Sequence, residues 1–217
     1  IRAADLPCPY IYPATGLHRG MLALDRINQH NQGFRMAYLK SDFFARDTLE
    51  VARDLIGSAL KVGQCEGRIV ETEAYTTDDA SHFVTRSRQA AAMRETFGHI
   101  YIYLIYGMYY CLNVTTERNG VGAVLIRAAE PVRGIDEMMN RRGTDDLKKI
   151  ASGPGRLCEA FGIDLKLNGL RLGREIKIKE RGYEPEISKS PRIGITRAAD
   201  LDWRFYETGN PFVSRRS

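Results

Sequence analysis

The sequence predicts an α+β fold: a single domain with a curved, mainly antiparallel sheet, surrounding helices and a protruding β-hairpin. Short strand patterns follow one another along the 217 residues with few helices between them, which favours antiparallel pairing. The segment 100–115 alternates apolar and tyrosine side chains on both sides of Gly107, as a hairpin does. Apolar residues make up 43 % and charged residues 27 %, so the chain has the composition of a globular protein rather than a disordered one.

Two regions are expected along the chain. Residues 1–40 are interrupted by prolines and glycines, and we predict an extension of uncertain order there. Residues 41–217 are predicted to form one domain. Its first well-patterned helix is expected to begin after Asp47, since Asp47 and Glu50 have the spacing of a capping box, and to end at Gly57.

The remaining elements follow from periodicity and from the glycines and prolines that interrupt it. A polar, basic stretch over 81–98 is expected to mix loop and helix, and a polar helix or loop is expected over 134–150. A helix is expected to open at Ser152-Gly153-Pro154-Gly155 and to end at Gly162. Besides the hairpin, strands are expected over 59–62, 67–75, 121–129 (ended by Pro131), 175–179, 192–196 and 203–206.

Charge and composition narrow the classes of function. The net charge is +5, which is compatible with a polyanionic partner but is also common among ordinary proteins. The four cysteines and four histidines are scattered, so we expect reduced thiols, an intracellular location and no metal site. No segment has the pattern of a signal peptide or a confident membrane span, and no membrane association is expected.

Glu71, Glu73 and Tyr75 share one face of the expected strand 67–75. Such residues often form only a solvated surface, but a carboxylate beside an aromatic wall can also act as a general base or stabilise a developing cation. Arg127 lies within an apolar run. A buried arginine needs a partner, and Glu130 or Glu73 could supply one.

The expected hairpin is rich in aromatic side chains. Six of the chain's twenty aromatic residues fall within fourteen positions: Phe97, Tyr101, Tyr103, Tyr106, Tyr109 and Tyr110. These rings could be a sheet surface packed under a helix, or a platform that stacks flat π-systems with a wedge at the turn. The turn Ser152 to Arg156, with Gly153, Gly155 and Arg156, exposes backbone N–H groups at a helix N-terminus, a geometry that binds phosphate.

Four segments together form a pattern that is not generic. They are Gly67-Arg-Ile-Val-Glu-Thr-Glu-Ala-Tyr75, Tyr101-Ile-Tyr-Leu-Ile-Tyr-Gly-Met-Tyr-Tyr-Cys-Leu-Asn113, Val124-Leu-Ile-Arg-Ala-Ala-Glu-Pro131 and Ser152-Gly-Pro-Gly-Arg-Leu157. In content, order and spacing they resemble the alkyladenine (3-methyladenine) DNA glycosylase family. The resemblance runs from about Phe43 to Ser214, so residues 41–217 are expected to be a glycosylase domain.

The resemblance implies a monofunctional base-excision enzyme that flips a damaged purine out of duplex DNA and hydrolyses the N-glycosidic bond with water. It implies no cofactor, no metal, no lysine Schiff base, and a monomer that acts on double-stranded DNA. Glu73 corresponds to the general base, and Arg127 to the arginine that helps to hold the water and the glutamate. The backbone carbonyl of Ile193 corresponds to a further water contact.

The resemblance also assigns the base pocket. Tyr75, His82 and Tyr103 correspond to the walls around the flipped base, and Asn113 to the asparagine that crowds the amino group of guanine. Tyr106, with Met108 beside it, corresponds to the residue that is inserted into the duplex. Lesions such as 3-methyladenine, 7-methylguanine, hypoxanthine and ethenoadenine all fit such a pocket.

Other classes of protein remain open at this point. A non-catalytic nucleic-acid-binding module would use the tyrosines to stack bases and leave the glutamates solvated. A carbohydrate-active enzyme would use Glu71 and Glu73 as a pair, although residues two apart on one strand project in parallel, which is awkward for groups that must flank a bond. A helix-hairpin-helix glycosylase is suggested only by Gly153-Pro154-Gly155.

Overall fold

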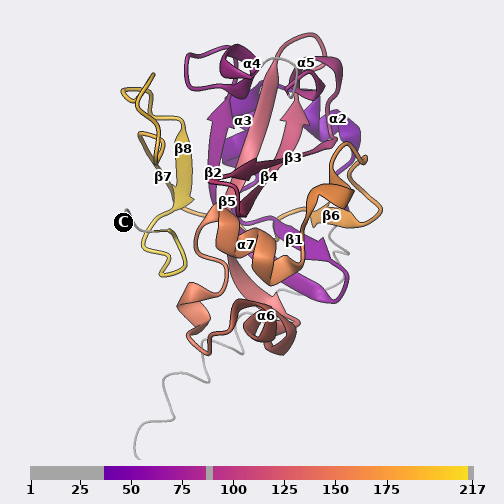
Figure 1. Ribbon diagram of the computed structural model, residues 1–217, viewed down its shortest axis with the longest axis vertical. Helices are drawn as coiled ribbons and strands as arrows, with labels where there is room; N and C mark the ends of the chain where they lie inside the picture. The colour runs from indigo at the N-terminus through magenta and orange to yellow at the C-terminus, as the bar shows by residue number, and fades with distance from the viewer. Residues whose placement is uncertain (1–36, 87–89, 215–217) are drawn as a thin grey trace, which may run out of the picture. The chain divides into compact units, whose positions relative to one another are not determined.

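The computed structural model describes residues 37–86 and 90–214 (Figure 1). The helices are α2 (Ser41–Phe44), α3 (Thr48–Asp54), α4 (His82–Thr85), α5 (Ala92–Glu95), α6 (Ile135–Arg142) and α7 (Pro154–Phe161), with short 3₁₀ turns at Leu147–Lys149 and Leu165–Leu167. The strands are β1 (Ala59–Val62), β2 (Cys65–Tyr75), β3 (Ile100–Ile105), β4 (Tyr109–Thr116), β5 (Gly122–Arg133), β6 (Ile176–Lys179), β7 (Ile187–Ser190) and β8 (Arg204–Glu207).

One curled antiparallel sheet organises the domain and confirms the predicted α+β class. Its order is β3-β4-β5-β2-β1-β6, and β8 pairs with both β2 and β7. Along one edge β2 pairs with β5, and along the other it pairs first with β1 and then with β8. Figure 1 shows α4 and α5 at one end of the long strands and α6 at the other end.

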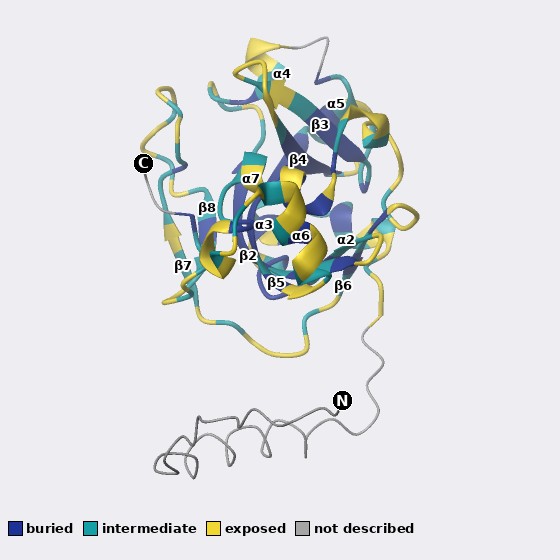
Figure 2. Cartoon of the chain, turned by 60° about the horizontal axis from the view of Figure 1, so that its bottom comes forward, coloured by how far each residue is buried: buried dark blue, intermediate teal, exposed yellow. Residues whose placement is uncertain are grey.

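Successive side chains of a strand point to opposite faces of the sheet, so the sheet has a core face and an opposite face, which we call the site face. On the core face, Ile102, Leu112, Val124 and Ile126 are buried in one cluster with residues of α3. Thr72 ties β2 to that helix, because its hydroxyl donates to the Ala52 carbonyl at 2.8 Å. In Figure 2 the strands are mostly buried, whereas much of α6 is exposed. The site face carries the alternate residues of the same strands.

The expected cap at Asp47 is confirmed, but the helix that it begins is shorter than predicted. Asp47 accepts from the backbone N–H groups of Leu49 and Glu50 at 2.9 and 3.1 Å. Helix α3 ends at Asp54, three residues before Gly57, which takes a φ of +88° in the turn that follows. The helix expected to end at Gly162 does so, in the left-handed conformation.

Two expectations about strands were wrong. Pro131 does not end its strand, since β5 continues to Arg133. Pro131 pairs with Gly67 beside a register shift, a position at which the sheet needs no backbone N–H donor. Residues 192–196 form no strand. Gly194 has a φ of +78° and the Arg192 side chain is buried in the interior, so this segment is a loop. The strand of this region is β7.

The pairing of β2 with β5 is irregular beside the predicted catalytic residues. Glu71 pairs with Ala128 and Thr72 pairs with Ile126, so the backbone of Arg127 is left out of the register between the two strands. Such bulges redirect side chains and are frequent next to active sites. Here the irregularity brings one arginine within reach of two glutamates on the neighbouring strand.

Residues 1–36 of the predicted extension lie outside the described residues. Its last residues run along the free edge of β6. The N–H of Leu39 donates to the Ile178 carbonyl at 2.8 Å, and the N–H of Glu180 donates to the Ala37 carbonyl at 2.9 Å. Residues 37–40 therefore extend the sheet rather than leave it.

Candidate active site

A cavity of about 210 Å³ opens on the site face of the sheet. It is smaller than the roughly 300–1,000 Å³ of a pocket for a drug-sized ligand, so it suits one group of modest size. Residues of β2, β3, β4 and β5 line it, together with His82 of α4, Met93 of α5, Pro154 and the loop 193–195. Its lining includes these sheet residues: Tyr75, Tyr101, Tyr103, Cys111, Asn113, Ala123, Leu125 and Arg127.

Glu73 is a fully buried carboxylate that is held by three donors. One oxygen accepts from the Tyr75 hydroxyl at 2.8 Å and from Arg127 at 3.2 Å. The other oxygen accepts from the backbone N–H of Ile193 at 2.7 Å. All three donor residues line the cavity, so Glu73 lies directly behind its wall. At Ile193 the amide N–H contacts Glu73. The expected water contact of the Ile193 carbonyl stays a prediction.

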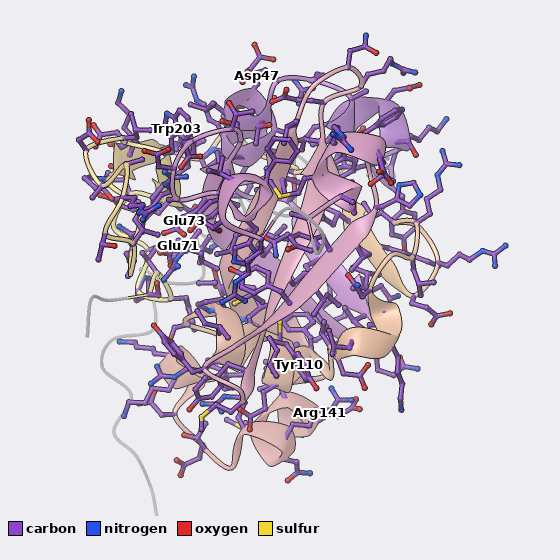
Figure 3. The ribbon with its side chains drawn as sticks, turned by 45° about the horizontal axis from the view of Figure 1, so that its top comes forward. Asp47, Glu71, Glu73, Tyr110, Arg141 and Trp203 are labelled. Atoms are coloured by element: carbon purple, nitrogen blue, oxygen red, sulfur yellow. The ribbon has the colours of Figure 1, made fainter. Side chains whose placement is uncertain are left out.

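Glu71 has a different environment, although it lies only two residues away on the same face (Figure 3). It is also fully buried, and it accepts from Arg127 at 3.1 Å, from Arg204 at 2.6 Å and from both the hydroxyl and the N–H of Ser214, at 2.8 and 2.7 Å. Four donors saturate this carboxylate. We therefore assign Glu71 to structure and leave Glu73 as the carboxylate nearest the cavity.

Arg127 joins the two glutamates. The sequence suggested Glu130 or Glu73 as its partner; Glu73 is confirmed, whereas Glu130 instead pairs with Arg68. Burial alone would lower the pKa of Arg127, but the two carboxylates outweigh it and raise the pKa above its ordinary value. The arginine therefore stays charged and fixes the orientation of Glu73.

The three predicted aromatic walls all line the cavity. The His82 and Tyr103 rings contact each other edge to face at 4.2 Å between centroids, and Tyr75 comes from β2. Burial raises the pKa of Tyr75 and Tyr103 well above 10, so both stay neutral. The Tyr101 hydroxyl lies 3.0 Å from Nδ1 of His82. The motif did not indicate this hydrogen-bond partner.

His82 is expected to lose its proton more readily than an ordinary histidine. Burial, and then the charge of Arg86, lower its pKa from 6.5. A depressed pKa means that the folded state gains stability above pH 6.5 that is lost as the pH falls through the lower, folded value. The imidazole resonance of His82, assigned by its absence from His82→Phe, should titrate below 6.5. A midpoint at or above 6.5 would contradict the buried, neutral ring.

Asn113 is fixed by the backbone around it. It is buried, and its amide group donates to the carbonyls of Tyr101 and Cys111 at 3.0 and 3.3 Å. Both donors are thereby occupied, and its side chain lines the cavity. The amide therefore keeps one orientation at the cavity wall.

The predicted hairpin is present, and its turn is exposed. Met108 donates its N–H to the Ile105 carbonyl at 3.2 Å, and Tyr106 and Gly107 both have positive φ, as in the primed turns that close hairpins. Tyr106 is 79 % exposed and Met108 is 65 % exposed. Two large apolar side chains therefore project into solvent at the turn.

The glycine-rich turn before α7 lies at the rim of the cavity through Pro154. The N–H of Gly153 is already used, since it donates to the Arg127 carbonyl at 3.1 Å, and Pro154 has none. Among the described residues the N–H groups of Gly155 and Arg156 have no acceptor, and the Arg156 side chain is exposed. Any anion contact at this turn therefore falls to Gly155 and Arg156, while Gly153 shapes the turn.

Two further properties concern only residues 37–86 and 90–214. In them, no group of three histidine, cysteine, aspartate or glutamate side chains lies together as metal ligands would. No helix in these ranges is long and apolar enough to cross a membrane.

Comparison with known proteins places the chain among relatives of similar length. A family model described as methylpurine-DNA glycosylase matches residues 42–211. A Methanoculleus marisnigri protein named "Putative 3-methyladenine DNA glycosylase" is 44 % identical over 190 residues, which is 82 % of this chain and 99 % of that protein. Proteins of the same name from Rhizobium etli and Agrobacterium fabrum are 47 % and 46 % identical, over 80 % and 86 % of this chain and 87 % and 96 % of their own.

Proposed function

The chain belongs to the methylpurine-DNA glycosylase family of DNA N-glycosylases, and on that premise we propose that it flips an alkylated or deaminated purine out of duplex DNA and hydrolyses the N-glycosidic bond with water. The observation that carries the proposal is the Glu73 site. A buried carboxylate, fixed by Arg127 and the Ile193 N–H, lies behind an aromatic cavity for one flat group.

Glu73 acts as the general base. It orients a water molecule toward the anomeric carbon and takes its proton as the carbon–oxygen bond forms and the purine leaves with the electrons of the glycosidic bond. The sugar develops positive charge in such reactions, and a nearby carboxylate offsets it. Tyr75 donates to the same oxygen that Arg127 contacts, so its hydroxyl must yield space when water binds.

The aromatic walls recognise the base. Purines alkylated at N3 or N7 are cations, and a cation stacked on an aromatic face gains about 0.5–2 kcal/mol. Tyr75 and Tyr103 stay neutral because burial raises the pKa of each. His82, whose pKa is lowered, adds no competing charge at neutral pH. Asn113 limits substituents at the edge of the ring.

The exposed side chains of the hairpin turn belong to the surface that binds DNA in this proposal. Tyr106 fills the gap left by the flipped base, with Met108 beside it, and Gly155 and Arg156 contact phosphate. The net charge of +5 adds a salt-dependent attraction to the duplex. The protein acts as a monomer in this scheme.

Replacing Tyr106 should separate stability from function. Its φ of +53° costs about 1–2 kcal/mol for an ordinary residue but less for asparagine. Tyr106→Asn should therefore keep or raise the free energy of unfolding, and lower base release about tenfold or more, because flipping costs a few kcal/mol. Tyr106→Phe, which keeps the ring, should release bases at close to the wild-type rate. Wild-type release by Tyr106→Asn would remove the wedge from the scheme.

Single-turnover base release tests the proposed function. Four duplexes that differ at one nucleotide carry 7-methylguanine, ethenoadenine, hypoxanthine or guanine. We expect release from at least one damaged duplex and none from guanine. Binding of the damaged duplexes without any release would instead support the alternative, a non-catalytic module that stacks bases on its tyrosines.

A further inference from the structure

Arg192 is a buried cation that the scheme above does not use. Its side chain has no exposed surface, and it does not line the cavity. Its guanidinium forms a bidentate pair with Asp78, at 3.2 and 2.6 Å, and donates to the Ala74 carbonyl at 2.9 Å. Burial alone would raise the pKa of Asp78, but the arginine outweighs it and lowers that pKa, so the pair is charged.

The guanidinium lies between two aromatic rings. Its central carbon is 4.7 Å from the ring centroid of Tyr75 and 5.0 Å from that of Trp203. Figure 3 shows Trp203 on the same side of the molecule as Glu71 and Glu73. Tyr75 lines the cavity and Arg192 does not, so the arginine contacts Tyr75 from behind the wall.

A cation behind an aromatic wall changes what the wall attracts. The face of a tyrosine attracts positive charge through the quadrupole of its ring. With a guanidinium on one face, a second cation on the other face meets repulsion across the ring, and a buried site screens that repulsion less than solvent would. A neutral purine does not experience this repulsion. Asp78 weakens the effect, since its charge opposes that of the arginine.

We propose that Arg192, acting through Tyr75, weakens the preference of the pocket for cationic over neutral purines, and that the charge of Asp78 determines how strong this effect is. The inference rests on the proposed function and refines its substrate class. Arg192 is a positioning and specificity residue here, since it contacts neither the base nor the water. It also precedes Ile193, whose N–H binds Glu73, so a general loss of activity alone would not distinguish its roles.

The ratio of two release rates makes the distinction. For each variant, single-turnover release is measured from a 7-methylguanine duplex, whose base is cationic, and from a hypoxanthine duplex, whose base is neutral. Both rates come from one preparation, so a loss of folded protein cancels from the ratio. A displaced Glu73 is controlled by the Arg192→Lys variant, which changes the same side chain but keeps its charge. Thermal unfolding monitored by circular dichroism checks each variant.

Three variants isolate the charge. Asp78→Asn leaves the arginine uncompensated and should lower the ratio of 7-methylguanine to hypoxanthine release. Adding Arg192→Met to it removes the cation and should raise the ratio about 3- to 10-fold above that of Asp78→Asn, as expected when part of a cation–π interaction changes. Adding Arg192→Lys instead keeps the charge without the planar fork, and the ratio should stay near that of Asp78→Asn.

Equal ratios in Asp78→Asn and Asp78→Asn/Arg192→Met would overturn the inference and leave the proposed function intact. If the methionine variant does not fold, the comparison of wild type with Asp78→Asn decides, and an unchanged ratio there overturns it as well. No release of either base by the wild type would remove the proposed function, and this inference with it.

Discussion

Glu73→Gln should abolish base release while the protein stays folded. A positioned general base contributes about 10²–10⁴-fold to a rate, and we expect a loss of that size in single-turnover release. Glutamine has the shape of glutamate and can still accept from the Ile193 N–H, so the loop 193–195 keeps its anchor. Arg127 retains Glu71 as an ionic partner. Duplex binding, measured by fluorescence anisotropy, should be unchanged because Glu73 has no exposed surface.

Tyr75→Phe is the matched control for this experiment. It removes the hydroxyl that donates to Glu73 but keeps the ring that lines the cavity. If Glu73 is the base, this variant should retain most of the activity that Glu73→Gln loses. Wild-type release by Glu73→Gln would exclude the carboxylate as the base, whereas a loss of release together with a loss of folding would assign Glu73 to structure.

Local sequence patterns predicted most of the fold, because these helix ends and hairpin strands are specified by residues that lie close together in the sequence. The cap at Asp47 and the left-handed end at Gly162 follow from residues within one helical turn. The alternation around Gly107 predicted both hairpin strands. The segment 192–196 looked like a strand by the same rule, yet Arg192 turns inward to Asp78, which lies 114 residues earlier. Local alternation carries no information about such a partner.

The candidate site was predicted only in part, for a similar reason. Motif resemblance brought out Glu73, Tyr75, Tyr103 and Arg127, and the fold places them at one cavity. It assigned the general base to Glu73 and gave Glu71 no role. The structural role of Glu71 rests on Arg204 and Ser214, which lie more than 130 residues away in sequence. Their arrangement around Glu71 exists only once β8 has paired with β2.

Glu71→Gln should damage stability far more than Glu73→Gln does. Removing one partner from a buried ion pair costs about 3–5 kcal/mol, because the remaining charge stays buried. Here the loss would leave both Arg127 and Arg204 undercompensated and would place an amide group among donors from Ser214. Domains of this kind are stable by about 5–15 kcal/mol, so a large part of the total would be lost. Urea unfolding should show a lower midpoint with an unchanged slope.

Glu130→Gln calibrates the effect of burial. Glu130 also pairs with an arginine, Arg68, but the two side chains keep about 28–31 % of their surface exposed. Solvent screens such a pair, so its loss should cost about 1 kcal/mol or less. A similar midpoint in Glu71→Gln and Glu130→Gln would mean that the buried network contributes no more than a surface pair. The expected difference would instead show that the four donors around Glu71 make this carboxylate part of the folded structure, which is the role we assign to it.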